Sequence, residues 1–289
     1  MYKRIIPILV TLSFNLFTIF GQSLLWKVSG KKMEAPSYLY GTIHIQDARV
    51  TAFDSTVLNT LNRCDAFAME VLLDEMDLRS IRKAMLMSEG KHLNSLLSTK
   101  DFALLDSICK AKLGISAIFM NGMKPFFVCS TLQQLDLRQD AEAPLDLFFL
   151  KKARESDKVC YGLEEYMDQI RAIDAISLKK QADMLRQFLH NTAQVSREFE
   201  DMLEAYLRFE LDSLAEMTQD TSLPKKFEKV LVSDRNVTMA KRFLKISSDH
   251  TVFCAVGAAH LAGKKGIIAL LRKKGYTVEP VPFTWRFEE

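Results

Sequence analysis

The sequence predicts an α/β (α+β) fold, with a central sheet formed by two strand–GxxH–helix–strand units and a long helical middle segment packed over it. Two apolar runs indicate the units, because "YLYGTIH" at 38–44 and "FCAVGAAH" at 253–260 both end in glycine, two further residues and histidine. Each run is followed by a helical stretch and a second apolar run, as in a βαβ unit. The middle of the chain is charged and amphipathic, which is typical of helices.

The chain begins with a segment typical of a secretory signal peptide. A cationic start, "MYKR", precedes an uncharged apolar run from Ile5 to Phe20, and the small residues of "GQS" follow. The run is short for a membrane-spanning helix. We therefore expect residues 1–22 to be a signal peptide cleaved close to Gly21–Ser23, and the protein to be periplasmic or extracellular, with no stable membrane span afterwards. Retention as an N-terminal anchor is the alternative.

The first unit follows this segment. "SYLYGTIH" predicts a strand at 38–43, and "DSTVLNTLNRC" predicts a short helix with Asp54 or Ser55 as its N-cap. "AFAMEVLL" predicts the second strand, at 66–71.

Helical periodicity dominates the chain between the two units. Residues 75–113 repeat apolar side chains at helical spacing, Pro125 breaks that pattern, and another helix follows Pro144. "KVCYGLE" predicts a strand at 158–162, and the amphipathic stretch 175–220 fits two long helices.

The last unit consists of a strand at 252–256, a helix that ends at Gly275 and a strand at 276–280. No linker rich in proline, glycine or serine divides the chain, so we expect one domain, 23–289, with a helical insertion at about 75–247. Five strands are expected to share one sheet: 38–43, 66–71, 158–162, 252–256 and 276–280.

Composition excludes several classes of function. The net charge is +3 and the basic residues are scattered, so no nucleic-acid partner is expected. The five cysteines are an odd, widely spaced set, which favours buried free thiols over a disulfide framework, although one disulfide remains an alternative. HExxH, GxSxG, the Walker loop and GxGxxG are all absent.

Three residues are candidate metal ligands. His44 and His260 each follow a glycine at a strand end, where ligands bind in open α/β sheets. Glu70 is an acid in an otherwise apolar strand, where an unpaired charge would be costly. Two imidazoles and a carboxylate suit a divalent metal ion. The alternative is that the histidines are ordinary loop residues and that Glu70 faces water.

Three further polar residues are weaker candidates. Glu164 in "YGLEE" again follows an apolar strand and a glycine, so it can reach the same edge of the sheet. Arg235 and Asn236 in "SDRN" can bind a carboxylate or a peptide carbonyl. Two of them also have a structural interpretation, a helix N-terminal charge for Glu164 and a surface ion pair for Arg235.

These motifs resemble those of the TraB/GumN family, which is related to the Tiki proteases. The similarity rests on "LYGTIHIQD", "AFAMEV", "YGLEE", "SDRN" and "VFCAVGAAHLAGKKGIIALLRKKGYTVEPV", in this order. It implies a metal-dependent hydrolase fold whose metal site corresponds to His44, Glu70 and His260. It also implies accessory polar roles for Glu164, Arg235 and Asn236.

The expected function is therefore an exported metal-dependent hydrolase that cleaves peptide or protein amide bonds, with Mn²⁺, Co²⁺ or Zn²⁺ as the cofactor. The metal would activate a water molecule and polarise the scissile carbonyl. Glu70, or Glu164 if Glu70 is a ligand, would be the general base, and Arg235 and Asn236 would stabilise the oxyanion or hold the substrate. The alternatives are a non-catalytic envelope protein that binds a peptide, haem or another small ligand in the same pocket, and an interaction protein that works through its helical middle.

Overall fold

The structure, a computed structural model, describes residues 22–72, 77–217 and 229–287. It is mixed α/β, which confirms the predicted fold class. The predicted signal peptide lies outside the described residues, apart from Gln22. Within these ranges no helix is both long and apolar enough to cross a membrane.

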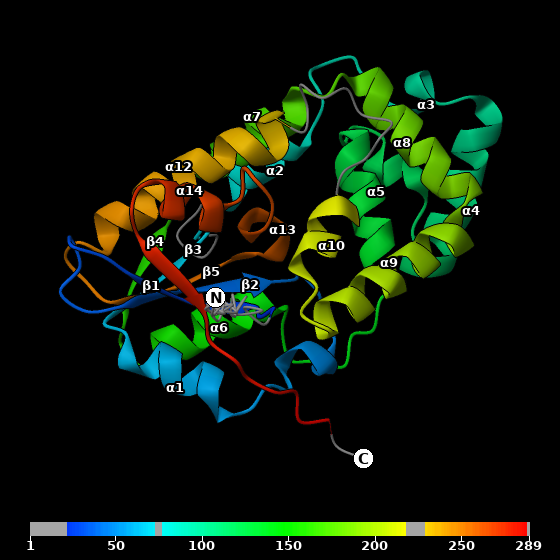
Figure 1. Cartoon of the computed structure of the whole chain (residues 1–289). Helices are drawn as coiled ribbons and strands as arrows, with labels where there is room; N and C mark the ends of the chain where they lie inside the picture. The colour runs from blue at the N-terminus through cyan, green and yellow to red at the C-terminus, as the bar shows by residue number, and fades with distance from the viewer. Residues whose placement is uncertain (1–21, 73–76, 218–228, 288–289) are drawn as a thin grey trace, which may run out of the picture.

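One six-stranded sheet, in the order β4-β3-β5-β2-β1-β6, forms the centre of the molecule (Figure 1). The five strands predicted to share a sheet all belong to it, so that prediction is confirmed. The sixth strand, β1, was not predicted, because its short "LWKVS" run directly follows the apolar N-terminal segment. It pairs antiparallel with both β2 and β6. The strands are β1 (Leu25–Ser29), β2 (Ser37–Thr42), β3 (Ala66–Met69), β4 (Val159–Gly162), β5 (Val252–Gly257) and β6 (Thr277–Pro280).

The four strands β4, β3, β5 and β2 are parallel, so their carboxyl ends meet at the same edge. The pairing register aligns the carboxyl ends of neighbouring strands, because Thr42 pairs with Gly257 and Met69 pairs with both Ala255 and Gly162. Strands β3 and β5 are almost completely buried, as expected for parallel strands that are covered on both faces.

Helices cover both faces of the sheet. On one face α6 (Leu145–Glu155) contacts β3, β4 and β5, with α1 (Ser55–Arg63) beside it. On the other face lie α12 (Asp234–Ile246) and α14 (Ile267–Lys273) (Figure 1).

The side chain of Asp54 accepts a hydrogen bond from Thr56 N, which confirms Asp54 as the N-cap of α1. Phe149 of α6 packs against Phe253, with their ring centroids 5.2 Å apart.

The helical middle has a hydrophobic cluster of its own beside the sheet, formed mainly by α3, α4, α5 and α8 (Figure 1). Only part of the middle therefore packs over the sheet. The helices of this region are α2 (Leu78–Met85), α3 (Leu93–Leu96), α4 (Thr99–Leu113), η3 (Ala117–Met120), α5 (Pro125–Gln134), α7 (Tyr166–Asp174), α8 (Leu178–His190), α9 (Thr192–Leu207) and α10 (Leu211–Met217). Three short helices complete the described elements: η1 (Ala48–Thr51), η4 (Lys229–Ser233) and α13 (Ala258–Leu261).

The five cysteines all lie within the described ranges, none of them forms a disulfide, and four are buried. The prediction of buried free thiols is confirmed for those four. Cys160 in β4 is the partly exposed one.

Candidate active site

The candidate site lies at the carboxyl edge of the parallel strands. His44 follows β2, Glu70 follows β3, and His260 lies on α13, directly after β5. The loop after β4 brings Glu164 to the same edge, where its backbone N–H donates to the carbonyl of Glu70 at 2.8 Å.

Glu70 is the centre of the cluster. Its Oε1 lies 3.9 Å from His44 Nε2 and 3.8 Å from His260 Nε2. The same oxygen accepts a hydrogen bond of 2.8 Å from the backbone N–H of Gly257. Burial raises the pKa of Glu70, but His260, His44, Arg235 and the Gly257 N–H together outweigh it and lower this pKa to about 2. Glu70 is therefore a carboxylate at neutral pH.

Gly257 keeps the space between the three side chains open. A Cβ at this position would lie 3.3 Å from Glu70 Oε1, 3.5 Å from His260 Cδ2 and 3.6 Å from His44 Nε2. The glycine of the other motif, Gly41, has a different role. A Cβ there would lie 3.1 Å from the Cα of Ala258, so this glycine lets α13 pack closely against β2.

Arg235 reaches the site from the first turn of α12 and binds two carboxylates. Its Nη2 donates to Glu70 Oε2 at 2.7 Å, and its Nε donates to Glu164 Oε2 at 2.9 Å. Its Nη1 donates to the carbonyl of Leu231 at 3.0 Å. The Glu164 side chain is only 1% exposed. This geometry favours a role for Arg235 in compensating buried charge rather than in binding substrate.

Asn236 lies behind His260 and is 1% exposed. Its Nδ2 donates to the carbonyl of Lys265 at 2.9 Å, which leaves Oδ1 to accept from His260 Nδ1 at 2.6 Å. The free nitrogen of His260, Nε2, is then directed towards Glu70. Burial lowers the pKa of His260 to about 4, although Glu70 opposes the shift, so the ring is neutral at pH 7.

His44 has an acidic partner that the sequence interpretation missed. Asp146 Oδ2, in the first turn of α6, lies 3.3 Å from His44 Nδ1. Desolvation lowers the pKa of His44, but Asp146 and then Glu70 outweigh it and raise this pKa to about 9. Gln169 was missed as well; its Nε2 donates to Glu70 Oε2 at 3.2 Å. Acids and amides are common in helix first turns and exposed helix faces, so the sequence held no signal for either.

The donor types at the site fit a divalent metal, but the donor atoms are slightly too far apart. Ligands at about 2.0–2.2 Å from a tetrahedral ion lie roughly 3.4 Å from one another. The two Nε2 atoms are 3.8 and 3.9 Å from Glu70 Oε1, so each pair would close by about half an ångström. In agreement, no group of three His, Cys, Asp or Glu side chains within the described ranges already has the arrangement of a metal site.

The cluster opens into a cleft of about 1060 Å³ between the edge of the sheet and the helical middle. His44, Glu70, Arg235, Gly257 and His260 all line it. Helices α5, α9 and α10 provide an apolar wall that includes Phe126, Phe127, Val195, Phe199, Met202 and Leu214.

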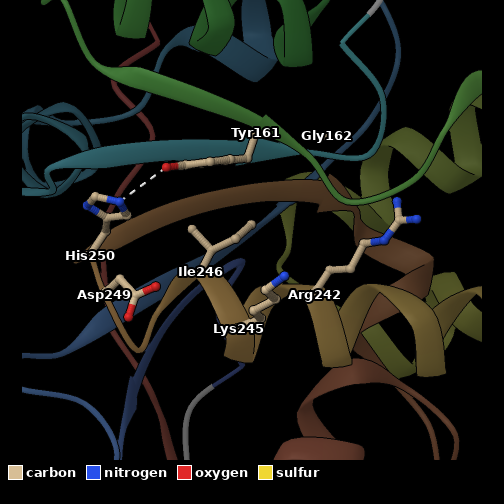
Figure 2. Close-up of a pocket in the computed structure, with 7 residues that line it drawn as sticks. All are labelled: Tyr161, Gly162, Arg242, Lys245, Ile246, Asp249 and His250. Carbon is tan, nitrogen blue, oxygen red and sulfur yellow. Dashed lines mark hydrogen bonds between the residues drawn. The ribbon is translucent and has the colours of Figure 1, made fainter.

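A second hollow, of about 300 Å³, shares none of these residues (Figure 2). It lies between β4 and the carboxyl-terminal part of α12, with Arg242 and Lys245 on its wall. There the hydroxyl of Tyr161 lies 3.1 Å from His250 Nε2. His190 in turn pairs with Asp101 at 2.7 Å. These two histidines have partners of their own, away from the candidate site.

A family sequence model matches nearly all of the described residues. The sequence model of the TraB/PrgY/gumN family matches residues 24–280. The chain is 25% identical to "Metalloprotease TIKI homolog" of Nematostella vectensis, an alignment that covers 90% of this chain and 67% of that protein.

Vertebrate relatives are similarly distant. "Metalloprotease TIKI2" of Danio rerio is 23% identical, over 90% of this chain and 61% of that protein. "Metalloprotease TIKI1" of Homo sapiens is 22% identical, over 90% of this chain and 62% of that protein. The chain thus spans roughly two thirds or less of the length of these relatives. No solved structure matches it.

Proposed function

The chain belongs to the TraB/PrgY/gumN family, and from this membership and the geometry of the cleft we propose that it is a metal-dependent hydrolase that cleaves peptide or protein amide bonds. The relatives named as metalloproteases support the reaction class. The observation that carries the proposal is the meeting of two imidazole Nε2 atoms with Glu70 Oε1 beside Gly257, at the wall of a large cleft.

His44, Glu70 and His260 would hold the metal, as Mn²⁺, Co²⁺ or Zn²⁺. When bound, such an ion supplies a water molecule of lowered pKa and polarises the scissile carbonyl. Other residues of the protein hold the proposed ligands in place before the metal binds. Asn236 fixes the His260 ring through Nδ1, and Arg235 holds Glu70 through Oε2, which leaves Oε1 directed towards the histidines.

Besides Arg235, we propose that two residues have roles other than those expected. Glu164 was the expected general base if Glu70 is a ligand, but its carboxylate is buried and bound by Arg235. We therefore propose that Glu164 positions Arg235. Asn236 was expected to contact substrate, but both ends of its amide are already hydrogen-bonded within the protein. We propose that it positions His260 instead.

The substrate would be a peptide or an extended protein segment, because the cleft is long enough to border α5, α9 and α10 and its wall is rich in apolar side chains. We also propose that residues 23–289 act as a single domain, with an insertion at about 75–247, and that the segment 1–22 directs the protein to the periplasm or the outside of the cell.

Metal analysis and turnover of the purified mature protein, residues 23–289, test this proposal. We expect hydrolysis of a peptide library in the presence of Mn²⁺, Co²⁺ or Zn²⁺ and its loss on chelation. His44→Ala and His260→Ala should lose metal binding and hydrolysis together. His92→Ala is the matched control, because that histidine precedes α3 and makes no side-chain cap.

A wild-type protein that binds the ions and hydrolyses nothing would instead support the non-catalytic binding protein. A wild-type protein that binds none of the three ions would refute the metalloenzyme.

A further inference from the structure

Asp146 places a carboxylate beside the candidate metal site. It lies in the first turn of α6, between Pro144 and the completely buried Phe149. Its Oδ2 lies 3.3 Å from His44 Nδ1. Its Oδ1 is buried and has no hydrogen-bond partner among the described residues. The side chain as a whole is 17% exposed and borders the cleft, and the contact with His44 is the ion pair that the structure records for it.

We propose that Asp146 is a positioning residue, which holds the His44 ring by Nδ1 so that Nε2 is directed towards Glu70 and the metal. The inference rests on the proposed metal site. Metal-binding histidines commonly donate their second ring N–H to a carboxylate or a carbonyl, which fixes the ring and makes the ligating nitrogen more basic.

The arrangement at the other histidine supports this role. His260 Nδ1 is held by Asn236 Oδ1 at 2.6 Å, while its Nε2 faces Glu70 Oε1. His44 has a comparable but looser arrangement, in which Asp146 Oδ2 forms an ion pair with its Nδ1 at 3.3 Å. Each ring therefore has a polar partner on Nδ1 and presents Nε2 to the same carboxylate oxygen.

The difference between the two partners follows from burial. The His260 side chain is only 10% exposed, so packing restricts its ring and a neutral amide suffices. The His44 side chain is 53% exposed at the cleft, so its ring has less packing around it than that of His260. A charge-assisted contact is stronger than a neutral one, and it restrains the more exposed ring of His44.

Removal of the carboxylate should therefore weaken metal binding while the fold persists. For Asp146→Ala we expect the dissociation constant for Zn²⁺ or Co²⁺ to rise by about 10- to 100-fold, the usual effect of losing such a partner. Asp146→Asn should show a smaller effect, because the amide oxygen can still accept from His44 Nδ1.

The matched control is Asp212→Asn. Asp212 is likewise an acid in the first turn of a helix, α10, so this variant reproduces the loss of a favourable charge at a helix N-terminus. It should leave the metal affinity unchanged. Thermal unfolding of all variants would separate loss of the site from loss of the fold.

Two readouts test the inference. The first is titration of the metal-free full-length mature protein with Zn²⁺ and Co²⁺ against a competing chelator. The second is ¹H–¹⁵N NMR of the histidine rings in the metal-free protein, which detects the Nδ1–H of His44 without any metal. We expect that signal in the wild type and in Asp212→Asn, and its loss in Asp146→Ala.

The inference is wrong if the wild type binds metal and Asp146→Ala binds it equally tightly, or if the His44 Nδ1–H signal is the same in both. If the wild type and His44→Ala both fail to bind metal, the proposed metalloenzyme itself has failed, and the positioning role falls with it.

Discussion

Gly257→Ala should weaken metal binding with little change in the stability of the fold. The added methyl group would lie 3.3 Å from Glu70 Oε1 and 3.6 Å from His44 Nε2, within the space that the three side chains surround. A bound ion at about 2.0–2.2 Å from the same donor atoms needs that space and a further closure of the donors, which the methyl group opposes. We expect the dissociation constant to rise by at least about 10-fold, as for other disturbances of a metal site.

The effect on stability is small because two contributions oppose each other. Gly257 has φ −51° and ψ 133°, which alanine adopts without strain. Replacing glycine at such a position typically stabilises a protein by about 0.4–1 kcal/mol through the unfolded chain. The 3.3 Å contact with Glu70 Oε1 requires a shift of a few tenths of an ångström and offsets that gain. We expect the free energy of unfolding to change by less than about 1 kcal/mol, or roughly 2–4 °C in Tm.

Gly41→Ala is the comparison variant, because its added methyl group should affect the stability of the fold. There the new Cβ would press on the Cα of Ala258 at 3.1 Å and on Leu261 Cδ1 at 3.1 Å, inside the packed core. Overpacking of this kind costs about 1–3 kcal/mol, so Gly41→Ala should lower Tm clearly. The assays are calorimetric titration with Zn²⁺ and thermal unfolding by circular dichroism. Wild-type metal affinity in Gly257→Ala would refute the reasoning.

Three other outcomes are expected. Arg235→Met should lower the free energy of unfolding by about 3–5 kcal/mol in chemical denaturation, because it leaves Glu70 and Glu164 as uncompensated buried charges; a loss below 1 kcal/mol would contradict this. Metal at about 100 times its dissociation constant should stabilise the wild type by about 2.7 kcal/mol, seen as a higher Tm, and should not stabilise Glu70→Gln. Burial raises the pKa of Asp54, but hydrogen bonds from its neighbours, including Thr284, outweigh it and lower this pKa to about 2. The stabilisation that the ionised Asp54 provides is therefore complete above its ordinary pKa of about 4 and is lost as the pH falls through 2. The difference in free energy of unfolding between the wild type and Asp54→Asn should therefore vanish near pH 2.

The sheet could be predicted from the sequence because its central strands are nearly continuous apolar runs bounded by glycine and helix signals. The rule that parallel strands end at one edge then places His44, Glu70 and His260 near one another. Strand β1 was not predicted, because it is short and its place in the sheet depends on pairing with β2 and with β6, which is distant in sequence. Local pattern alone does not encode such pairing.

The roles of the polar side chains were harder to predict than their position. Arg235 is separated by 71 residues from Glu164 and by 165 from Glu70, so the sequence shows a basic residue but not the two buried acids that it binds. Asp146 illustrates the same limit, because an acid in the first turn of a helix normally stabilises the helix alone. Its contact with His44 exists only after α6 has packed against the sheet.

The charge balance of the assembled cluster supports a cation site. Glu70, Glu164 and Asp146 contribute three negative charges and Arg235 one positive charge, so the cluster carries −2 while both imidazoles are neutral. Buried charge without compensation is strongly destabilising. Glu70 and Glu164 are buried, Asp146 borders the cleft, and Arg235 alone cannot neutralise all three carboxylates. In the metal-free protein, protonation of His44, whose pKa is raised to about 9, supplies part of the missing charge. A divalent ion held by the proposed ligands His44, Glu70 and His260 would supply all of it.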